Sequence, residues 1–289
     1  MKDICCAGHL TLDKIITTRG TTYMNGGTSF YFSYAISRLP RSVSYQLVTR
    51  LADKDMDAVG KMRNAGIDVI AYTCPETLYF ENKYGDNQNN RSQRVLARAV
   101  PFSIDDFRNV EARVFHLGTL LADDFPVEVV EYLSGRGRIS IDVQGYLREV
   151  RGERVYHVDW QDKLRILNLT DILKLNEHEM EVITGLREPH EVAKVIAGWG
   201  VGEVVITLGS YGSLIYADGR FFDIPAYAPT EIVDATGCGD TYSAGYLYCR
   251  ANGAGYEESG KFAAAMCTLK LEHSGSLDKT IDDIRRIMK

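Results

Sequence analysis

Short apolar or β-branched runs alternate with amphipathic helical patterns along most of this chain. Strand-like runs occupy residues 4–9, 45–51, 68–72, 114–117, 139–143, 172–175 and 204–208, and helix-like patterns occupy 56–63, 127–133, 177–183 and 191–198. Strands that alternate with helices predict an α/β fold, in which helices flank both faces of a mostly parallel central sheet. In such sheets, ligands bind beyond the carboxyl ends of the strands.

Two β-rich segments interrupt the alternation, at about residues 14–25 and 77–100. The first has two β-rich halves around Arg19 and Gly20, and the second has a turn-rich centre, GDNQNNR. We interpret both as hairpins inserted into the α/β frame, where they form a small β-sheet lid over a pocket. The alternative is that they extend an edge of the main sheet. From Asp240 onward the pattern is helical.

The composition is that of a globular protein. The chain has 289 residues, of which 45% are hydrophobic and 25% charged, and this length allows one large domain or two smaller ones. Lys and Arg number 33 against 39 Asp and Glu, which gives a net charge of −6. Because the sequence has no local basic cluster, we expect no nucleic-acid partner. It also has neither the ~18 apolar residues of a membrane span nor a signal-peptide core, so we expect a cytoplasmic protein.

The cysteines and histidines do not follow a metal-binding pattern. Six cysteines are scattered without a CxxC pair, which is typical of free thiols in a reducing compartment. His178 and His190 are each followed by Glu, as in zinc proteases, but neither pair has a second His at the required spacing. Zinc-dependent hydrolysis is therefore not expected.

The segment 233–245, VDATGCGDTYSAG, carries the most specific chemistry. A β-like run at 231–234 leads into a turn with Gly237 and Gly239, and a helix is predicted to begin near Asp240. The backbone N–H groups of such a loop, with the helix dipole behind them, form a site suited to a phosphoryl group. Asp240 could then accept the proton of an attacking hydroxyl. The alternative is that Asp240 only caps the helix.

The part of this segment that reads DATGCGD resembles DTxGAGD, the carboxy-terminal signature of the ribokinase-like (PfkB) carbohydrate kinases. The resemblance implies an ATP-dependent kinase with a three-layer ribokinase-like fold. It assigns Asp240 as catalytic base and Gly237, Cys238 and Gly239 as the anion hole. It also implies Mg²⁺ beside the ATP, and a monovalent cation such as K⁺ at Asp234.

Three further segments are similar to motifs of the same family and occur in the same order. They read GHLTLD (followed by Gly26 and Gly27), KLNEHE and VITLGSYG, and they are similar to the substrate motif, the NxxE motif and the ATP-contacting turn. The resemblance implies that Glu179 organises hydrated Mg²⁺. It places ATP on Lys174, Asn176, Thr207, Gly209, Gly212 and Thr236, and the acceptor on Asp13, Gly26, Gly27, Thr28, Gln144 and Arg148.

Each segment has a simpler interpretation when it is taken alone. Asp13 could be a turn residue, Glu179 an exposed carboxylate in the first turn of a helix, and the glycines of the ATP motif a plain strand-end turn. The competing phosphate motif GYEESGKF, at 255–262, has Phe where a P-loop needs Ser or Thr, so we interpret it as a helix start. The kinase motifs must meet at one site, which predicts a single domain over residues 1–289 with the lid inserted.

The acceptor is predicted from positions at which this chain differs from the motifs of the family. Tyr31 stands where ribose-binding members carry Asn, and DVQGYLR at 142–148 changes the spacing of another motif. These segments, with GGTSFY and TLYFEN, look most like the myo-inositol kinase branch, so we expect a cyclic polyol acceptor. The alternative is a sugar or nucleoside, as for ribokinases and fructokinases. Arg91, Arg94 and Arg148 are candidates for binding a substrate phosphate if they point into the pocket, and the alternative is that they are solvated on the lid or the surface.

Two other classes of function compete with the kinase. A nicotinamide oxidoreductase would need GxGxxG after the first strand, where this chain has AGHL. A non-catalytic ligand-binding protein on the same fold would have no use for Asp240 and Glu179.

Cys238 replaces a residue that is small in the family, and beside helix N-terminal amides its thiol is expected to have a lowered pKa. Unpaired edge strands in the lid make a homodimer an expectation.

Overall fold

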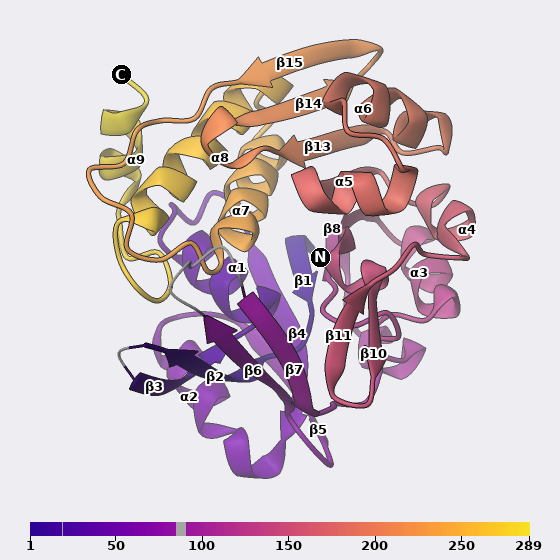
Figure 1. The fold of residues 1–289 in the computed structure, drawn as a ribbon, viewed down its shortest axis with the longest axis vertical. Coiled ribbons are helices and arrows are strands. Elements are labelled where there is room, and N and C mark those ends of the chain that lie inside the picture. Colours follow the sequence, from indigo (N-terminus) through magenta and orange to yellow (C-terminus); the bar gives the residue numbers. More distant parts are fainter. Residues whose placement is uncertain (19, 85–90) are drawn as a thin grey trace.

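Two β-sheets organise the computed structural model, which describes residues 1–18, 20–84 and 91–289 (Figure 1). Within these residues, a nine-stranded sheet has the order β15-β14-β13-β12-β9-β8-β1-β4-β5, and a six-stranded sheet has the order β10-β11-β7-β6-β2-β3. The large sheet and its helices confirm the predicted α/β class, with a second, smaller sheet beside them.

The strand-like runs of the sequence form the parallel part of the large sheet. These strands are β1 (Lys2–Ala7), β4 (Tyr45–Ala52), β5 (Val69–Cys74), β8 (Ala112–Gly118), β9 (Arg138–Asp142), β12 (Ile172–Asn176) and β13 (Glu203–Thr207). Two antiparallel strands that the pattern did not predict, β14 (Ser213–Ala217) and β15 (Arg220–Ile224), extend one edge. A hairpin needs no helical crossover, so it leaves no α/β alternation to detect.

Helices cover both faces of the large sheet. One apolar cluster includes α1 (Thr28–Ser37), α2 (Asp57–Asn64), α7 (Cys238–Ala251), α8 (Tyr256–Leu271) and α9 (Ile281–Ile287), and the other includes α3 (Val127–Ser134), α4 (Lys163–Leu167), α5 (Glu177–Thr184) and α6 (Pro189–Gly198). In β1, Ile4 and Cys6 belong to the first cluster, whereas Cys5 and Ala7 belong to the second. This alternation explains the continuous apolar run of the strand, because both of its faces are buried.

The six-stranded sheet contains both predicted β-rich insertions. They form β2 (Thr11–Thr17) with β3 (Gly20–Gly26), and β6 (Leu78–Tyr84) with β7 (Arg91–Ala97). These strands pair within the small sheet and not at an edge of the large one. Residues 85–90, where the sequence predicted a turn, lie outside the described residues. A third hairpin, β10 (Arg148–Arg151) and β11 (Arg154–His157), completes the sheet and was not predicted.

Short connections place the small sheet at the carboxyl ends of the large-sheet strands. Strand β2 begins four positions after β1 ends, and a 3₁₀ turn (Val143–Leu147) joins β9 to β10. Apolar side chains of β6 and β7 pack on Leu120 and Leu121, which follow β8. The small sheet therefore faces the edge at which ligands of parallel sheets bind.

Three local predictions concern the segments that lead into α7 and α8. The predicted strand at 231–234 is wrong, because this segment runs without a β partner and the amides of Val233 and Asp234 donate to the Leu271 carbonyl instead. Helix α7 begins at Cys238, two residues before the position predicted. The competing phosphate motif is a helix start, as predicted, since α8 begins directly after Gly255.

No helix in the described ranges is both long enough and apolar enough to cross a membrane.

A buried carboxylate anchors α7 to the large sheet. Glu203, at the start of β13, is 3% exposed. Its side chain lies 2.9 Å from an Arg138 nitrogen and 3.2 Å from an Arg250 nitrogen, and it accepts a 2.7 Å hydrogen bond from the Tyr246 hydroxyl. Because Tyr246 and Arg250 belong to α7, this network fixes the helix that carries Asp240.

We expect Glu203→Gln to lower the free energy of unfolding by about 2–4 kcal/mol, because the buried Tyr246 hydroxyl and the partly exposed guanidinium groups of Arg138 and Arg250 lose a charged acceptor. Urea denaturation measures this change. The matched control is Glu131→Gln, which removes an ion pair with Arg165 at the surface and should cost less than about 0.5 kcal/mol. Equal losses for the two variants would contradict the anchoring role.

Candidate active site

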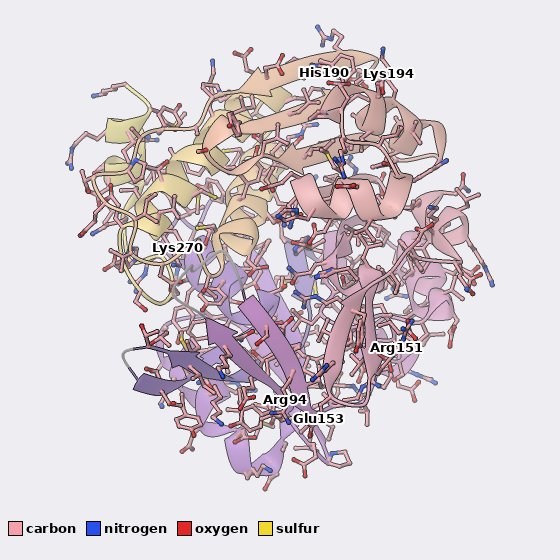
Figure 2. The ribbon with its side chains drawn as sticks, in the orientation of Figure 1. Arg94, Arg151, Glu153, His190, Lys194 and Lys270 are labelled. Atoms are coloured by element: carbon pink, nitrogen blue, oxygen red, sulfur yellow. The ribbon has the colours of Figure 1, made fainter. Side chains whose placement is uncertain are left out.

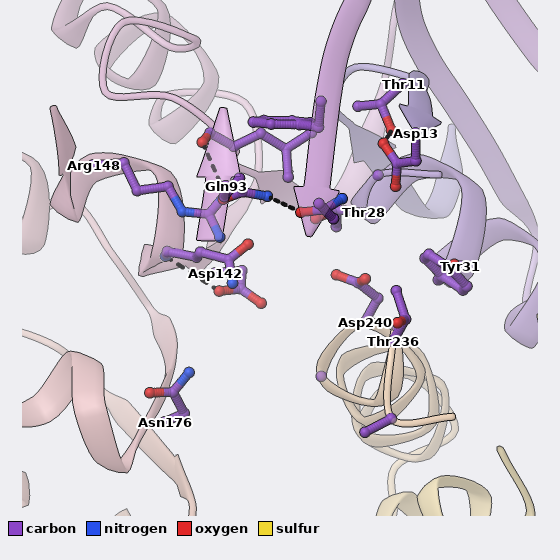
Figure 3. A pocket seen from close by; sticks show the side chains of 18 of the residues that line it. Thr11, Asp13, Thr28, Tyr31, Gln93, Asp142, Arg148, Asn176, Thr236 and Asp240 are labelled. Carbon is purple, nitrogen blue, oxygen red and sulfur yellow. Dashed lines mark hydrogen bonds between the residues drawn. The ribbon is translucent and has the colours of Figure 1, made fainter. Parts of the chain in front are cut away.

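A cavity of about 260 Å³ lies between the two sheets and the N-terminal end of α7 (Figure 3). It brings together residues from both ends of the chain. The predicted site residues that line it are Asp13, Gly27, Thr28, Gln144, Arg148, Lys174, Asn176, Thr207, Thr236, Gly237, Gly239 and Asp240. The segments that resemble the substrate motif and the catalytic turn thus meet at one place.

The remaining predicted residues lie around the cavity without lining it. Gly26 ends β3 next to the Asp13 carboxylate, and Gly209 and Gly212 flank the turn after β13. Cys238 contacts α8, as described below. Glu179 and Asp234 support residues that do line the cavity.

Further lining residues were not assigned from the sequence. They are Thr11, Tyr31, Phe80, Asn82, Gln93, Leu120, Asp142 and Ala235. Gln93 of β7 donates a 2.9 Å hydrogen bond to Asn82 of β6, and Asn82 is 5% exposed. Alternation along β6 puts Leu78, Phe80 and Asn82 on one face. Asn82 could therefore have been recognised in the sequence as a polar residue on an otherwise apolar face of the strand.

Asp240 lies in the first turn of α7 and points into the cavity, toward the space between Thr28 and Asp142 (Figure 3). Burial, and then the negative charge of Asp142, raise the pKa of Asp240 to about 6, while Lys174 and a hydrogen bond with Thr28 oppose the rise. A carboxylate with this pKa is ionised at neutral pH and remains basic enough to take a proton from a reacting hydroxyl.

The turn before α7 is shaped for close approach. Gly237 has a φ of 78°, and a side chain there would collide with the Tyr31 ring. A Cβ on Gly239 would lie only 2.7 Å from the Lys174 ammonium nitrogen. The two glycines therefore let an aromatic ring and a cation approach the backbone amides at a helix N-terminus, where anions bind.

Lys174 is the central cation of the cavity. It is 7% exposed, and its ammonium nitrogen lies 2.9 Å from Oδ2 of Asp142, on the neighbouring strand β9. Burial alone would lower the pKa of Lys174, but Asp142, Glu179 and Asp240 together raise it above its usual value. The ammonium is therefore charged and available to an anionic ligand.

Glu179 takes part in a capping box at the start of α5. Its Oε2 accepts a 2.8 Å hydrogen bond from the Asn176 amide, while Oδ1 of Asn176 accepts 2.9 Å bonds from the amides of His178 and Glu179. The carboxylate is 4% exposed, so the alternative of an exposed first-turn carboxylate does not describe it. Burial raises the pKa of Glu179, and Lys174 opposes that rise.

The residues before α7 rest on α8. Asp234 accepts a 2.9 Å hydrogen bond from the Thr236 amide, and the ammonium of Lys270 lies 3.6 Å from its other carboxylate oxygen. The Cys267 thiol donates to the Cys238 carbonyl at 3.0 Å. A hydrogen bond from Cys267, and then the charge of Lys270, lower the pKa of the Cys238 thiol despite its burial.

Of the three arginines considered for a substrate phosphate, the side chain of Arg91 lies outside the part of the chain that the structure describes. Arg94 and Arg148 lie on different sides of the small sheet. Arg148 is 3% exposed, lines the cavity and donates to the Leu120 carbonyl at 3.3 Å. Arg94 pairs instead with Glu81 and Glu153 at the surface, as the labels of Figure 2 show for the latter pair. Of these two, Arg148 is placed to contact a ligand in the cavity.

The arrangement suits transfer of an anionic group to a hydroxyl. A buried carboxylate, a charged lysine and a glycine turn at a helix N-terminus surround one polar cavity. The carboxylate can accept a proton, and the cation and amides can stabilise negative charge on the group that is transferred.

Comparisons with known proteins agree with this chemistry. The model of the pfkB family of carbohydrate kinases matches residues 59–283. A cytidine kinase of Thermococcus kodakarensis is 34% identical over 271 residues, which cover 89% of this chain and 92% of that protein. A nucleoside kinase of Methanocaldococcus jannaschii is 32% identical, with 95% and 92% covered.

A solved structure resembles this fold over almost its whole length. It is a pyrophosphate-dependent kinase of the ribokinase family, complexed with a pyrophosphate analogue and myo-inositol. The TM-score is 0.88 at 25% identity, and the match covers 98% of this chain and 99% of that one. The fold is therefore ribokinase-like, and the chain belongs to the pfkB family of carbohydrate kinases, which transfer phosphoryl groups to hydroxyls.

Proposed function

We propose that this kinase phosphorylates a hydroxyl of a cyclic polyol, with myo-inositol as the favoured acceptor and Asp240 as general base. The observation that carries the proposal is the position of Asp240. Its carboxylate faces a polar cavity, its pKa is raised to about 6, and it stands in the first turn of a helix preceded by a glycine turn. Proton acceptance and charge stabilisation are thereby adjacent, as phosphoryl transfer requires.

The cavity lining supports a hydroxyl-rich acceptor. On the side of the small sheet, the polar residues are Thr11, Asp13, Asn82, Gln93, Gln144 and Arg148. Phe80 and Leu120 add a limited apolar surface that suits the C–H face of a ring. A cyclic polyol carries hydroxyls around its whole rim, so it can use the donors and acceptors that β2, β6, β7 and the start of β10 place along this wall.

A nucleoside is the second candidate, because the two relatives described above, which match most of this chain, are named cytidine kinase and nucleoside kinase. A base would need an additional, largely apolar slot beyond the sugar. The predominantly polar lining and the myo-inositol held by the structural neighbour favour the polyol.

We propose ATP as the phosphoryl donor, with pyrophosphate as the second candidate because the structural neighbour depends on it. Both donors end in a phosphoryl group that Lys174 and the amides of residues 237–239 can stabilise. Mg²⁺ suits this site because it keeps several waters and binds mainly to phosphates, and the buried carboxylates of Glu179 and Asp142 are near Lys174. When bound, Mg²⁺ would offset phosphate charge.

The acceptor and donor are tested together in one panel. Purified protein with Mg²⁺ is given myo-inositol, ribose, fructose, adenosine or cytidine, each with ATP and with pyrophosphate. We expect kcat/KM to be highest for myo-inositol with ATP. A preference for cytidine or adenosine would support the nucleoside candidate. Turnover with pyrophosphate but not with ATP would show that pyrophosphate is the phosphoryl donor. Turnover with none of the pairs would contradict the kinase proposal and favour a ligand-binding role.

We expect Asp240→Asn to lower kcat by about 10²–10⁴-fold, because the amide cannot accept the hydroxyl proton. Donor affinity, measured by calorimetry, should change little, since the amides and Lys174 remain. Asp105→Asn, which alters an exposed carboxylate paired with Arg108, is the matched control and should retain the original kcat. Undiminished turnover in the Asp240 variant would exclude it as general base.

A further inference from the structure

Lys270 is a completely buried lysine next to the catalytic turn. It belongs to the last turn of α8 and has no exposed surface. Its ammonium donates to the carbonyl oxygens of Asp234 at 3.0 Å and His273 at 3.2 Å, and it lies 3.6 Å from the Asp234 carboxylate. Figure 2 labels Lys270 beside the segment that leads into α7.

The two Asp234 oxygens belong to the segment that enters the active site, whereas the His273 carbonyl follows the end of α8. The Asp234 carboxylate also accepts the Thr236 amide, and the Leu271 carbonyl accepts the amides of Val233 and Asp234. Thr236 and Gly237 line the cavity directly. The Lys270 ammonium, together with the Leu271 carbonyl, therefore holds the segment that leads into the turn before Asp240.

Burying an ammonium is costly unless polar oxygens replace its hydration shell. Here two carbonyl oxygens and one carboxylate group replace the hydration shell of the ammonium. Carbonyl and carboxylate oxygens are also the ligands that surround a desolvated hard cation. The lysine thus places a covalently attached cation in an oxygen cage. Its positive charge reaches the start of α7, where it adds to the hydrogen bond from Cys267 in lowering the pKa of the Cys238 thiol.

We propose that Lys270 is a positioning residue whose ammonium takes the place of a free monovalent cation beneath the catalytic turn, so that the enzyme is independent of K⁺. This inference rests on the kinase activity proposed above, and it replaces the K⁺ that the sequence resemblance implied at Asp234. A tethered cation is present at every ionic composition, so the turn stays formed without a bound ion.

The first test is the dependence of the wild-type rate on the cation. Initial rates are measured with K⁺, Na⁺ or tetramethylammonium as the monovalent cation, at constant ionic strength. We expect equal rates in all three. A several-fold activation by K⁺ over tetramethylammonium would overturn the proposal.

The second test removes the tethered cation in two ways. Lys270→Ala leaves both the oxygens and space for an ion, whereas Lys270→Met fills the space with an uncharged chain. We expect both variants to lose roughly tenfold to hundredfold in kcat. Added K⁺ or NH₄⁺ should restore part of the rate of the Ala variant only. Lys261→Ala, which alters an exposed lysine of the same helix, is the control and should behave like wild type.

Melting temperature provides a readout that needs no turnover. K⁺ or NH₄⁺ should raise the melting temperature of Lys270→Ala above its value in tetramethylammonium, because an ion that binds only the folded state stabilises it. Wild type and Lys270→Met should show no such difference. If Lys270→Ala responds to none of these cations in rate or melting, Lys270 has a structural role only and the proposal is wrong. If wild type shows no kinase activity, the melting series still decides this inference separately.

Discussion

The Lys174–Asp142 ion pair is the interaction on which the active site depends. It joins β12 to β9 at the carboxyl edge of the large sheet, and Asp240 and Glu179 approach the same ammonium from α7 and α5. Three carboxylates around one buried lysine would repel one another without that charge. In a protein of net charge −6, this local cation and the helix amides are what make an anionic donor acceptable.

Neighbouring strands and short connections, and not long loops, bring these groups together. Parallel pairing of β12 with β9 and β13 aligns their carboxyl ends, and the Asn176 capping box starts α5 directly after β12. From the other side, α8 holds the turn before α7 through the ammonium of Lys270. The catalytic turn is thus fixed between a charged sheet edge and a buried lysine, and each support acts on a different part of it.

Much of this arrangement could be predicted from the sequence. Continuous apolar runs identified the parallel strands, because both faces of these strands are buried, and the glycine turn marked the N-terminus of α7. The short β10–β11 hairpin and the β14–β15 edge were not predicted, because no helix separates their strands in the sequence. Asn82 and Gln93 meet only through pairing of β6 with β7, and the contacts of Lys270 depend on how α8 ends. Such tertiary contacts leave no local pattern.

We propose Asp240 as a general base whose proton affinity is set by its neighbours. The most direct test is the pH profile of kcat/KM for the acceptor at saturating donor. Because the base must be ionised, the rate should rise with pH through about 6 and then level off. In Asp142→Asn the inflection should move to lower pH, since a negative neighbour is removed. A profile without an inflection near 6, or one that Asp142→Asn leaves in place, would contradict the account.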